Sequence, residues 1–397
     1  MDKDKKKILC YNKVALKEKR KNNKFQCRKG KRRKIMAKTK VGIIGYGWVA
    51  GANHKNSYEQ AKDVEIVAVC DVNKAALERA KKDYNLSDDC LFDDYKKMID
   101  SGLCEMVDIC TPNSLHCEQA KYALNAGLPV SIEKPVGVNS QEVEEVRALA
   151  EKKGLPVFIC FTWRHMPTTR YLKDVIDSGA VGKVYHCYIK CIKESGLWEG
   201  RRLEWRFQKE YGGTGVLCDL GSHMIDFLNW MNEDIVGLSA NMGIFIKKRQ
   251  KLDSDEWADV TTDDYANIIA DLKSGATANI ELSRCAKTEG QLVEFIIYGE
   301  KGYIRYCNYV GEGLEICYGD KETIAKGKQR VATPEKYGKG YQLYQSQSFI
   351  DLANGKSDNF TSTIDDGLRA QMVIDAAIKS AEEKRYVTIE EIKKGLK

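Results

Sequence analysis

The sequence predicts an α/β protein with an N-terminal doubly wound parallel sheet and a C-terminal α+β domain that contains a large open, mostly antiparallel sheet. Two observations carry this prediction. Between residues 41 and 162, short apolar segments alternate with helical ones, as expected when each strand of a parallel sheet is followed by a helix. After residue 165, long alternating segments follow one another, which is typical of antiparallel strands. The length of 397 residues also favours two domains.

The first half of the chain contains five apolar segments that read as strands. Because the intervening helices return the chain to the same edge, the strands are parallel and ligands are expected at their carboxyl ends. Polar residues follow the strands there, namely Asp71, Thr111 to Asn113, Glu133 to Pro135 and Thr162 to His165. The expected strands are 40–44, 66–70, 106–110, 129–133 and 156–161, and the expected helices are 74–84, 114–125 and 140–152.

The second half combines long strands with a few helices. A helix is expected near 221–231, and a C-terminal helix at 365–383 is expected to pack back on the first domain. The other expected elements are a helix at 168–178 and strands at 184–193, 235–247, 265–271, 277–284, 292–298 and 302–307.

The segment 45–50, GYGWVA, matches the Gly-x-Gly-x-x-Ala turn that leads from a strand into a helix and binds the pyrophosphate of a dinucleotide. Gly45 permits the tight turn, Gly47 lets the backbone approach the phosphates, and the helix N-terminus supplies N–H groups. The next strand ends at Asp71, 21 residues after Ala50, where a carboxylate can accept from both ribose hydroxyls. The sequence therefore predicts a Rossmann domain that prefers NAD to NADP, with cofactor contacts from Gly45, Tyr46, Gly47, Trp48, Val49 and Asp71.

The charge of the chain is unevenly distributed. Residues 1–35 hold 16 Lys and Arg against three acids, a net charge of +13, and the other 362 residues hold 48 basic and 54 acidic side chains, a net charge of −6. A basic arm can bind nucleic acid or a membrane, but Met36 also resembles a native start, so we expect a dispensable, disordered leader. With neither a signal peptide nor an 18-residue apolar span visible, we expect a cytoplasmic protein without nucleic-acid or membrane partners.

The 14 cysteines are scattered and contain no Cys-x-x-Cys pair. Many lie in apolar segments, which favours buried free thiols in a reducing compartment over disulfides. His186, Cys187 and Cys191 are the one grouping that suggests a metal. Alternation along a strand would turn the two thiols to the same face without a fourth ligand, so we expect no metal.

Two segments carry residues suited to catalysis, 133–135 (EKP) and 212–226 (GGTGVLCDLGSHMID). Lys134, at a strand end, can hydrogen-bond a substrate hydroxyl and favour its alkoxide, although a lysine in an exposed loop would look the same. Asp219 and His223 are four residues apart and share one helical face. His223 is suited to act as a general base whose tautomer a nearby carboxylate orients. Alternatively, Asp219 caps the helix and His223 packs in its flank.

These residues, in this order, resemble the glucose–fructose oxidoreductase/inositol dehydrogenase (Gfo/Idh/MocA) family. The resemblance runs from about Lys38 to the C-terminus. Its motifs are GYGWVA, the acid of VAVCDVN, TPNSLH at 111–116, EKP, RHMP at 164–167, WRF at 205–207 and GGTGVLCDLGSHMID. It implies domains at 38–162 (NAD-binding Rossmann domain), 163–360 (substrate and oligomerisation domain) and 361–397 (the C-terminal helix packed back on the Rossmann domain), after a leader at 1–37.

The resemblance also implies functional residues. Lys134, Asp219 and His223 would form the catalytic trio, with His223 as base and Lys134 on the reacting hydroxyl. The cofactor would be lined by Thr111, Pro112, Asn113, His116, Glu133 and Lys134, and Trp163 and Arg164 would border the nicotinamide and the substrate. Substrate contacts are expected from Lys134, Arg164, Trp205, Arg206, Asp219 and His223.

The expected function is that of an NAD-dependent oxidoreductase that transfers hydride between the nicotinamide and a secondary alcohol of a sugar, glycoside or cyclitol. Two alternatives use the same dinucleotide site. One is a glycosidase that retains NAD and cleaves by transient oxidation and elimination. The other is a non-catalytic NAD-bound regulator, which an intact trio argues against. A homodimer or homotetramer is expected because the second sheet offers an exposed face.

Overall fold

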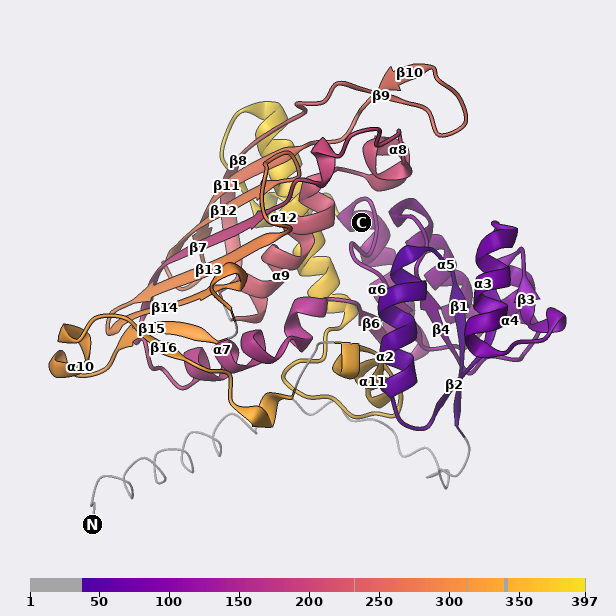
Figure 1. The fold of residues 1–397 in the computed structure, drawn as a ribbon, viewed down its shortest axis with the longest axis horizontal. Coiled ribbons are helices and arrows are strands. Elements are labelled where there is room, and N and C mark those ends of the chain that lie inside the picture. Colours follow the sequence, from indigo (N-terminus) through magenta and orange to yellow (C-terminus); the bar gives the residue numbers. More distant parts are fainter. Residues whose placement is uncertain (1–37, 232, 312, 339–341, 397) are drawn as a thin grey trace, which may run out of the picture. The chain divides into compact units, whose positions relative to one another are not determined.

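The computed structural model describes residues 38–231, 233–311, 313–338 and 342–396, and the predicted leader lies outside them. Residues Thr39–Lys397 form one compact unit (Figure 1). Within the described residues, no helix is both long and apolar enough to cross a lipid bilayer. The domain boundaries inferred from the sequence remain predictions, and the two sheets are described in turn.

The first sheet has six strands, all parallel, in the order β3-β2-β1-β4-β5-β6. This order confirms the predicted doubly wound sheet, because the chain first builds outward from β1 on one side and then on the other. The direction changes between β1 and β4, which places the switch point beside the Gly45 turn. The strands are β1 Thr39–Ile44, β2 Val64–Cys70, β3 Leu91–Phe92, β4 Met106–Ile109, β5 Val130–Ile132 and β6 Val157–Ile159.

The helices of this half begin and end where the sequence signals them. Asn73 caps α3, its side chain accepting from the amide of Ala75 at 2.8 Å, and Asn139 caps α6 in the same way. Gly154, with a φ of 65°, ends α6 in the left-handed conformation that glycine favours. The helices are a π-helical turn Ala50–His54 that continues into α2 Lys55–Gln60, then α3 Lys74–Tyr84, α4 Tyr95–Asp100, α5 Asn113–Asn125 and α6 Ser140–Lys153.

The second sheet has nine strands in the order β16-β15-β14-β13-β7-β12-β11-β8-β17. It is mostly antiparallel, as predicted, with one parallel pair between β7 and β12. The strand β8 ends at Gly243, earlier than the predicted 247, because the amides of Phe245 and Ile246 donate to the Asp264 carboxylate and turn the chain away. The strands are β7 Val184–Ile192, β8 Ile235–Gly243, β11 Tyr265–Leu272, β12 Thr277–Ser283, β13 Leu292–Gly299, β14 Gly302–Cys307, β15 Leu314–Tyr318, β16 Gln329–Val331 and β17 Val387–Thr388, beside a separate hairpin of β9 Lys248–Gln250 and β10 Trp257–Asp259.

Helices cover one face of the second sheet, on the side of the parallel sheet (Figure 1). The long helix α12 (Ile364–Glu383) contacts both β8 and α6, and α9 (Ser222–Trp230) packs against α12 with all nine of its residues buried. Because α9 is buried along its whole length, its packing restricts the positions of its side chains. The remaining helices are α7 Pro167–Asp177, α8 Lys209–Gly212, α10 Lys321–Ala325, α11 Gln342–Ala353 and α13 Ile389–Gly395, with short 3-10 turns at Asp88–Cys90, Thr162–His165, Ser195–Leu197, Trp205–Phe207, Asn308–Val310 and Glu335–Tyr337.

Candidate active site

The turn after β1 has the geometry of a dinucleotide-binding turn. Gly45 has a φ of 88°, and a Cβ there would lie 2.9 Å from the carbonyl of Cys110, so only glycine fits. A Cβ on Gly47 would meet no atom within 4 Å, which leaves the outer side of the turn open to a ligand. The side chain of Tyr46 is buried under the turn, whereas Trp48 beside it is 77% exposed. Val49 follows at the start of the helix, with its side chain half-buried.

Asp71 lies beside this turn, as the motif requires. Its Oδ2 accepts from the amide of Tyr46 at 2.7 Å and its Oδ1 from the amide of Asn73 at 2.8 Å. These bonds hold the carboxylate at the end of β2, next to the open side of Gly47. The open turn, the helix N-terminus and the acid together fit NAD, with the turn holding the pyrophosphate and Asp71 the ribose hydroxyls.

The residues predicted to line the cofactor after β4 have divided roles. Asn113 lines the pocket described below and donates from Nδ2 to the carbonyl of Gly212 at 2.9 Å. Pro112 precedes α5 as its N-cap residue, and Thr111 donates from its hydroxyl to Gln119 at 2.7 Å. His116 is buried, with its ring nitrogens 2.9 and 2.7 Å from the carbonyls of Pro135 and Thr111. His116 therefore joins the loops after β4 and β5 and does not reach into the pocket.

A buried charge network supports the loop after β5. His54, which is 1% exposed, lies between two carboxylates, with Nδ1 2.7 Å from Asp108 Oδ2 and Nε2 2.8 Å from Glu133 Oε1. Burial disfavours a charged imidazole, but Asp108 outweighs it and raises the pKa of His54 well above its usual value. Both ring nitrogens therefore donate, and Tyr58 donates a further bond to Asp108 at 2.9 Å. This network fixes Glu133, whose other oxygen accepts from the amide of Lys134 at 3.1 Å.

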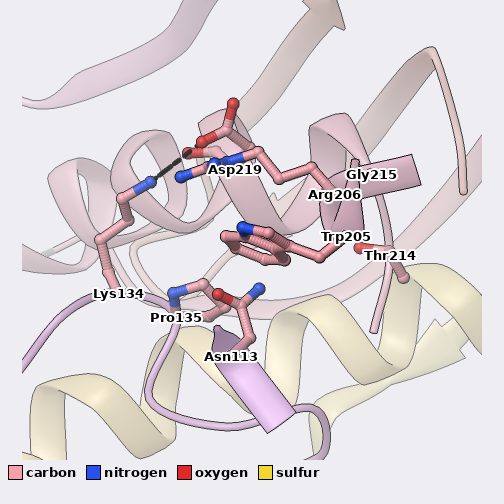
Figure 2. Close-up of a pocket in the computed structure, with 8 residues that line it drawn as sticks. All are labelled: Asn113, Lys134, Pro135, Trp205, Arg206, Thr214, Gly215 and Asp219. Atoms are coloured by element: carbon pink, nitrogen blue, oxygen red, sulfur yellow. Dashed lines mark hydrogen bonds and ion pairs between the residues drawn. The ribbon is translucent and has the colours of Figure 1, made fainter. Parts of the chain in front are cut away.

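Lys134 and Asp219 meet at a pocket between the carboxyl ends of the parallel strands and the second sheet (Figure 2). Lys134 Nζ donates to Asp219 Oδ1 at 3.2 Å and to the Asp219 carbonyl at 2.9 Å. Lys193, directly after β7, contacts the other carboxylate oxygen at 2.5 Å. Burial opposes ionisation of Asp219, but Lys193, Lys134 and Arg206 hold its pKa well below the usual range. Asp219 is thus a carboxylate clamped between two lysines.

His223 lies one helical turn after Asp219, at the start of α9. The trio therefore shares one region, as expected, but Asp219 does not orient the imidazole. Its carboxylate is bound to the two lysines, and His223 Nδ1 is buried without a hydrogen-bond partner among the described residues. Burial lowers the pKa of His223 well below its usual value, and Lys134 and Lys193 add to this while Asp219 opposes it. The imidazole is therefore neutral at physiological pH and able to accept a proton.

Trp205 and Arg206 line the same pocket, as predicted for substrate contacts. The Arg206 guanidinium stacks on the Trp205 ring at 4.2 Å from its centroid. Figure 2 shows the indole in the middle of the pocket, with Arg206 and Asp219 on one side and Asn113 and Pro135 on the other. An aromatic ring and a cation that bind each other thus lie beside Lys134 in the pocket.

Arg164 and Trp163 require a correction. The Arg164 guanidinium is buried and donates to both oxygens of Asp226, at 2.8 and 2.5 Å, and it also pairs with Asp366. These partners hold it between α9 and α12, and it does not line the pocket. Trp163 packs edge-on against Phe295 and another ring of the second sheet, so the structure brings neither residue to the pocket. The arginine of the RHMP segment at 164–167 therefore forms a buried ion pair with Asp226.

Sequence analysis missed Lys193, His54 and Asp108. Lys193 follows the carboxyl end of β7 in the second sheet, whereas the rule that ligands lie at the carboxyl ends of strands holds for parallel sheets. The described residues contain one candidate metal site, in which the possible ligand atoms lie within 4.8 Å of one another. It consists of His54, Asp108 and Cys160. Because carboxylates already occupy both ring nitrogens of His54, the charge network explains this group. Elsewhere in the described residues, Cys187 and Cys191 are buried free thiols.

Comparison with known proteins identifies the class of the chain. Residues 39–161 match the oxidoreductase family with an NAD-binding Rossmann fold, and residues 169–305 match the GFO/IDH/MocA C-terminal domain. The chain therefore belongs to the GFO/IDH/MocA family of NAD-binding oxidoreductases.

Individual relatives narrow the comparison. Levoglucosan dehydrogenase of Pseudarthrobacter phenanthrenivorans is 24% identical over 90% of this chain and 100% of its own length. D-glucoside 3-dehydrogenase of Escherichia coli is 30% identical over 47% of this chain and 52% of its own length. A levoglucosan dehydrogenase structure with NADH and L-sorbose has a TM-score of 0.81 at 24% identity, covering 89% of this chain and 99% of the other. This structural likeness confirms the fold.

The buried network makes a prediction about stability. His54→Leu leaves the carboxylates of Asp108 and Glu133 buried without their cation, so we expect a loss of about 3–5 kcal/mol in the free energy of unfolding. Urea unfolding at pH 7 measures this loss.

The neighbouring Lys55→Leu is the matched control, because Lys55 makes a surface ion pair with Glu59 at 3.0 Å. Its loss should be below about 1 kcal/mol. Equal losses in the two variants would contradict the assignment of His54 as the cation of the network.

Proposed function

We propose that the protein is an NAD-dependent dehydrogenase that acts on a secondary alcohol of a sugar, glycoside or cyclitol. The observation that supports this most directly is the contact of Lys134 with Asp219 in a pocket at the carboxyl ends of the parallel strands, with His223 one helical turn after Asp219. These groups provide a cation, a carboxylate and a neutral imidazole beside a dinucleotide-binding domain. The two curated relatives, a levoglucosan dehydrogenase and a D-glucoside 3-dehydrogenase, favour a carbohydrate substrate.

The residues divide the chemistry of alcohol oxidation between them. NAD, held by the turn at Gly45 and by Asp71, would supply the acceptor for the hydride of the carbinol carbon when it is bound. His223 takes the hydroxyl proton, and its lowered pKa keeps the imidazole unprotonated and ready to do so. Lys134 donates a hydrogen bond to the oxygen as it becomes an alkoxide and then a carbonyl. Trp205 and Arg206, which line the same pocket, would contact the substrate.

A panel of sugars, glycosides and cyclitols with NAD and NADP tests this function. We expect absorbance of reduced cofactor with at least one substrate and a higher kcat/KM for NAD, because the Asp71 carboxylate repels a 2′-phosphate. Asp71→Ser should narrow the difference between the two cofactors, and comparable values in the wild type would contradict the NAD preference. Cleavage of a glycoside without net NADH would instead favour the glycosidase, and binding of NAD without turnover the regulator.

His223→Ala tests the assignment of the base. Removal of a general base costs roughly two to four orders of magnitude in rate, so turnover should fall by that factor. The affinity for NAD should change little, because His223 lies on α9 and not on the parallel sheet. Lys134→Met should also remove most activity and weaken NAD binding.

The double variant provides the control for these two losses. If both groups act on one hydroxyl, the losses should not add in His223→Ala with Lys134→Met. Turnover close to wild type across the pH range in His223→Ala would exclude His223 as the base.

We also propose that the protein is cytoplasmic and forms a homodimer or homotetramer through the uncovered face of the second sheet. Strands β7, β13 and β11 carry Tyr188, Tyr298 and Ile269 there, which are 40, 40 and 64% exposed. An apolar patch of this kind favours self-association. Ile269→Asp should therefore shift the molar mass measured by light scattering toward the monomer, and an unchanged mass would contradict this interface.

A further inference from the structure

Lys193 occupies a fixed position at the end of the second sheet. Its amide donates to the carbonyl of Ser283 at 2.9 Å, and its own carbonyl accepts from the amide of Ala286 at 3.3 Å. The side chain is 21% exposed, and its ammonium contacts Asp219 Oδ2 at 2.5 Å. A surface lysine is free to sample many rotamers. In Lys193 the backbone is held by two hydrogen bonds and the ammonium is bound to the partly buried carboxylate of Asp219.

The two oxygens of Asp219 have separate cations. Oδ2 binds Lys193 from the second sheet, and Oδ1 binds Lys134 from the loop after β5. Lys134 also donates to the Asp219 carbonyl, so two of its three N–H groups are directed to one residue. A substrate oxygen must therefore compete with Asp219 for Lys134.

The cost of that competition depends on Lys193. If Lys134 were the sole partner of Asp219, a turn of Lys134 toward a substrate would leave the Asp219 carboxylate, whose side chain is 27% exposed, without a bonded cation, which is unfavourable. Resting on the proposed function, we propose that Lys193 is a positioning residue of this site: it holds Asp219 and thereby leaves Lys134 free to bind the reacting oxygen. Lys193 itself need not touch the substrate.

Lys193 also affects the pH range over which the base is active. The charged groups that face His223 are Lys134, Lys193 and Asp219, and Arg206 joins the lysines around Asp219. Removal of the Lys193 cation makes protonation of both His223 and Asp219 easier, so the pKa of each rises. A base with a higher pKa is protonated, and therefore inactive, up to a higher pH, so the acid limb of the kcat/KM profile should move upward.

Kinetics of Lys193→Met in the full chain test the proposal. We expect kcat/KM at pH 7, measured with the best substrate of the panel, to fall about tenfold to a hundredfold, which is the cost typical of a misplaced catalytic group. The Kd for NAD should be unchanged. The acid limb should move to higher pH. Lys193→Arg, which keeps a cation within reach of Asp219, should restore much of the rate and the original limb.

Lys287→Met is the matched control. Lys287 is a nearby lysine, largely exposed, that pairs with Glu194 at 3.5 Å and does not contact Asp219. The Lys287→Met substitution removes one positive charge from the same end of the second sheet, so the rate and pH profile of this variant should match those of the wild type. An equal effect of Lys287→Met and Lys193→Met would overturn the proposal, as would an unchanged profile in Lys193→Met.

A second measurement is independent of turnover. Titration of the His223 ring by NMR of histidine-labelled protein, assigned with His223→Ala, should show a higher pKa in Lys193→Met than in wild type or Lys287→Met. An unchanged pKa overturns the proposal even if Lys193→Met loses activity. Absence of NADH formation by the wild type with every sugar would instead contradict the proposed function, and the titration would still report on Lys193.

Discussion

The contact between Lys134 and Asp219 is the interaction on which the candidate site depends, because it joins the loop after β5 of the parallel sheet to the turn that leads into α9. Lys134 follows a strand of the parallel sheet, and Asp219 lies in the π-helical turn Leu217–Gly221 that leads into α9. Among the eight residues that line the pocket, Asp219 is the only carboxylate, so it is the one anion there that can hold a lysine from the other half. The geometry of the pocket therefore follows from this ion pair and the helix behind it.

Buried charges elsewhere keep that geometry rigid. Behind α9, Arg164 binds Asp226 and Asp366 and ties the helix to α12. Under the loop after β5, His54 binds Asp108 and Glu133. Each network places a cation between two carboxylates, so loss of the cation would leave both carboxylates without that partner. Rigid support of this kind suits groups that must meet a substrate within a fraction of an ångström.

The sequence predicted the fold well because its signals are local. Gly45, Asn73 and Gly154 each impose or favour a backbone conformation at their own position, and the turn and helix limits follow from them. The trio was found through motifs for the same reason. Contacts between distant segments were not predictable. Asp219 binds Lys193, 26 residues away in the sequence, and not His223. Arg164 binds Asp226, 62 residues away. Both contacts depend on how separate elements pack together.

The consecutive residues Glu133 and Lys134 explain why a short motif carries so much of the function. At the end of β5 their side chains go to opposite partners, Glu133 into the buried network of His54 and Lys134 to Asp219 across the pocket. The amide of Lys134 also donates to the Glu133 carboxylate, so the anchoring of one residue limits the movement of the next. A carboxylate fixed at the end of β5 thus holds the backbone from which Lys134 reaches Asp219 in the turn before α9. Lys193 completes the arrangement from the opposite side, because it gives Asp219 a cation that does not depend on the position of Lys134.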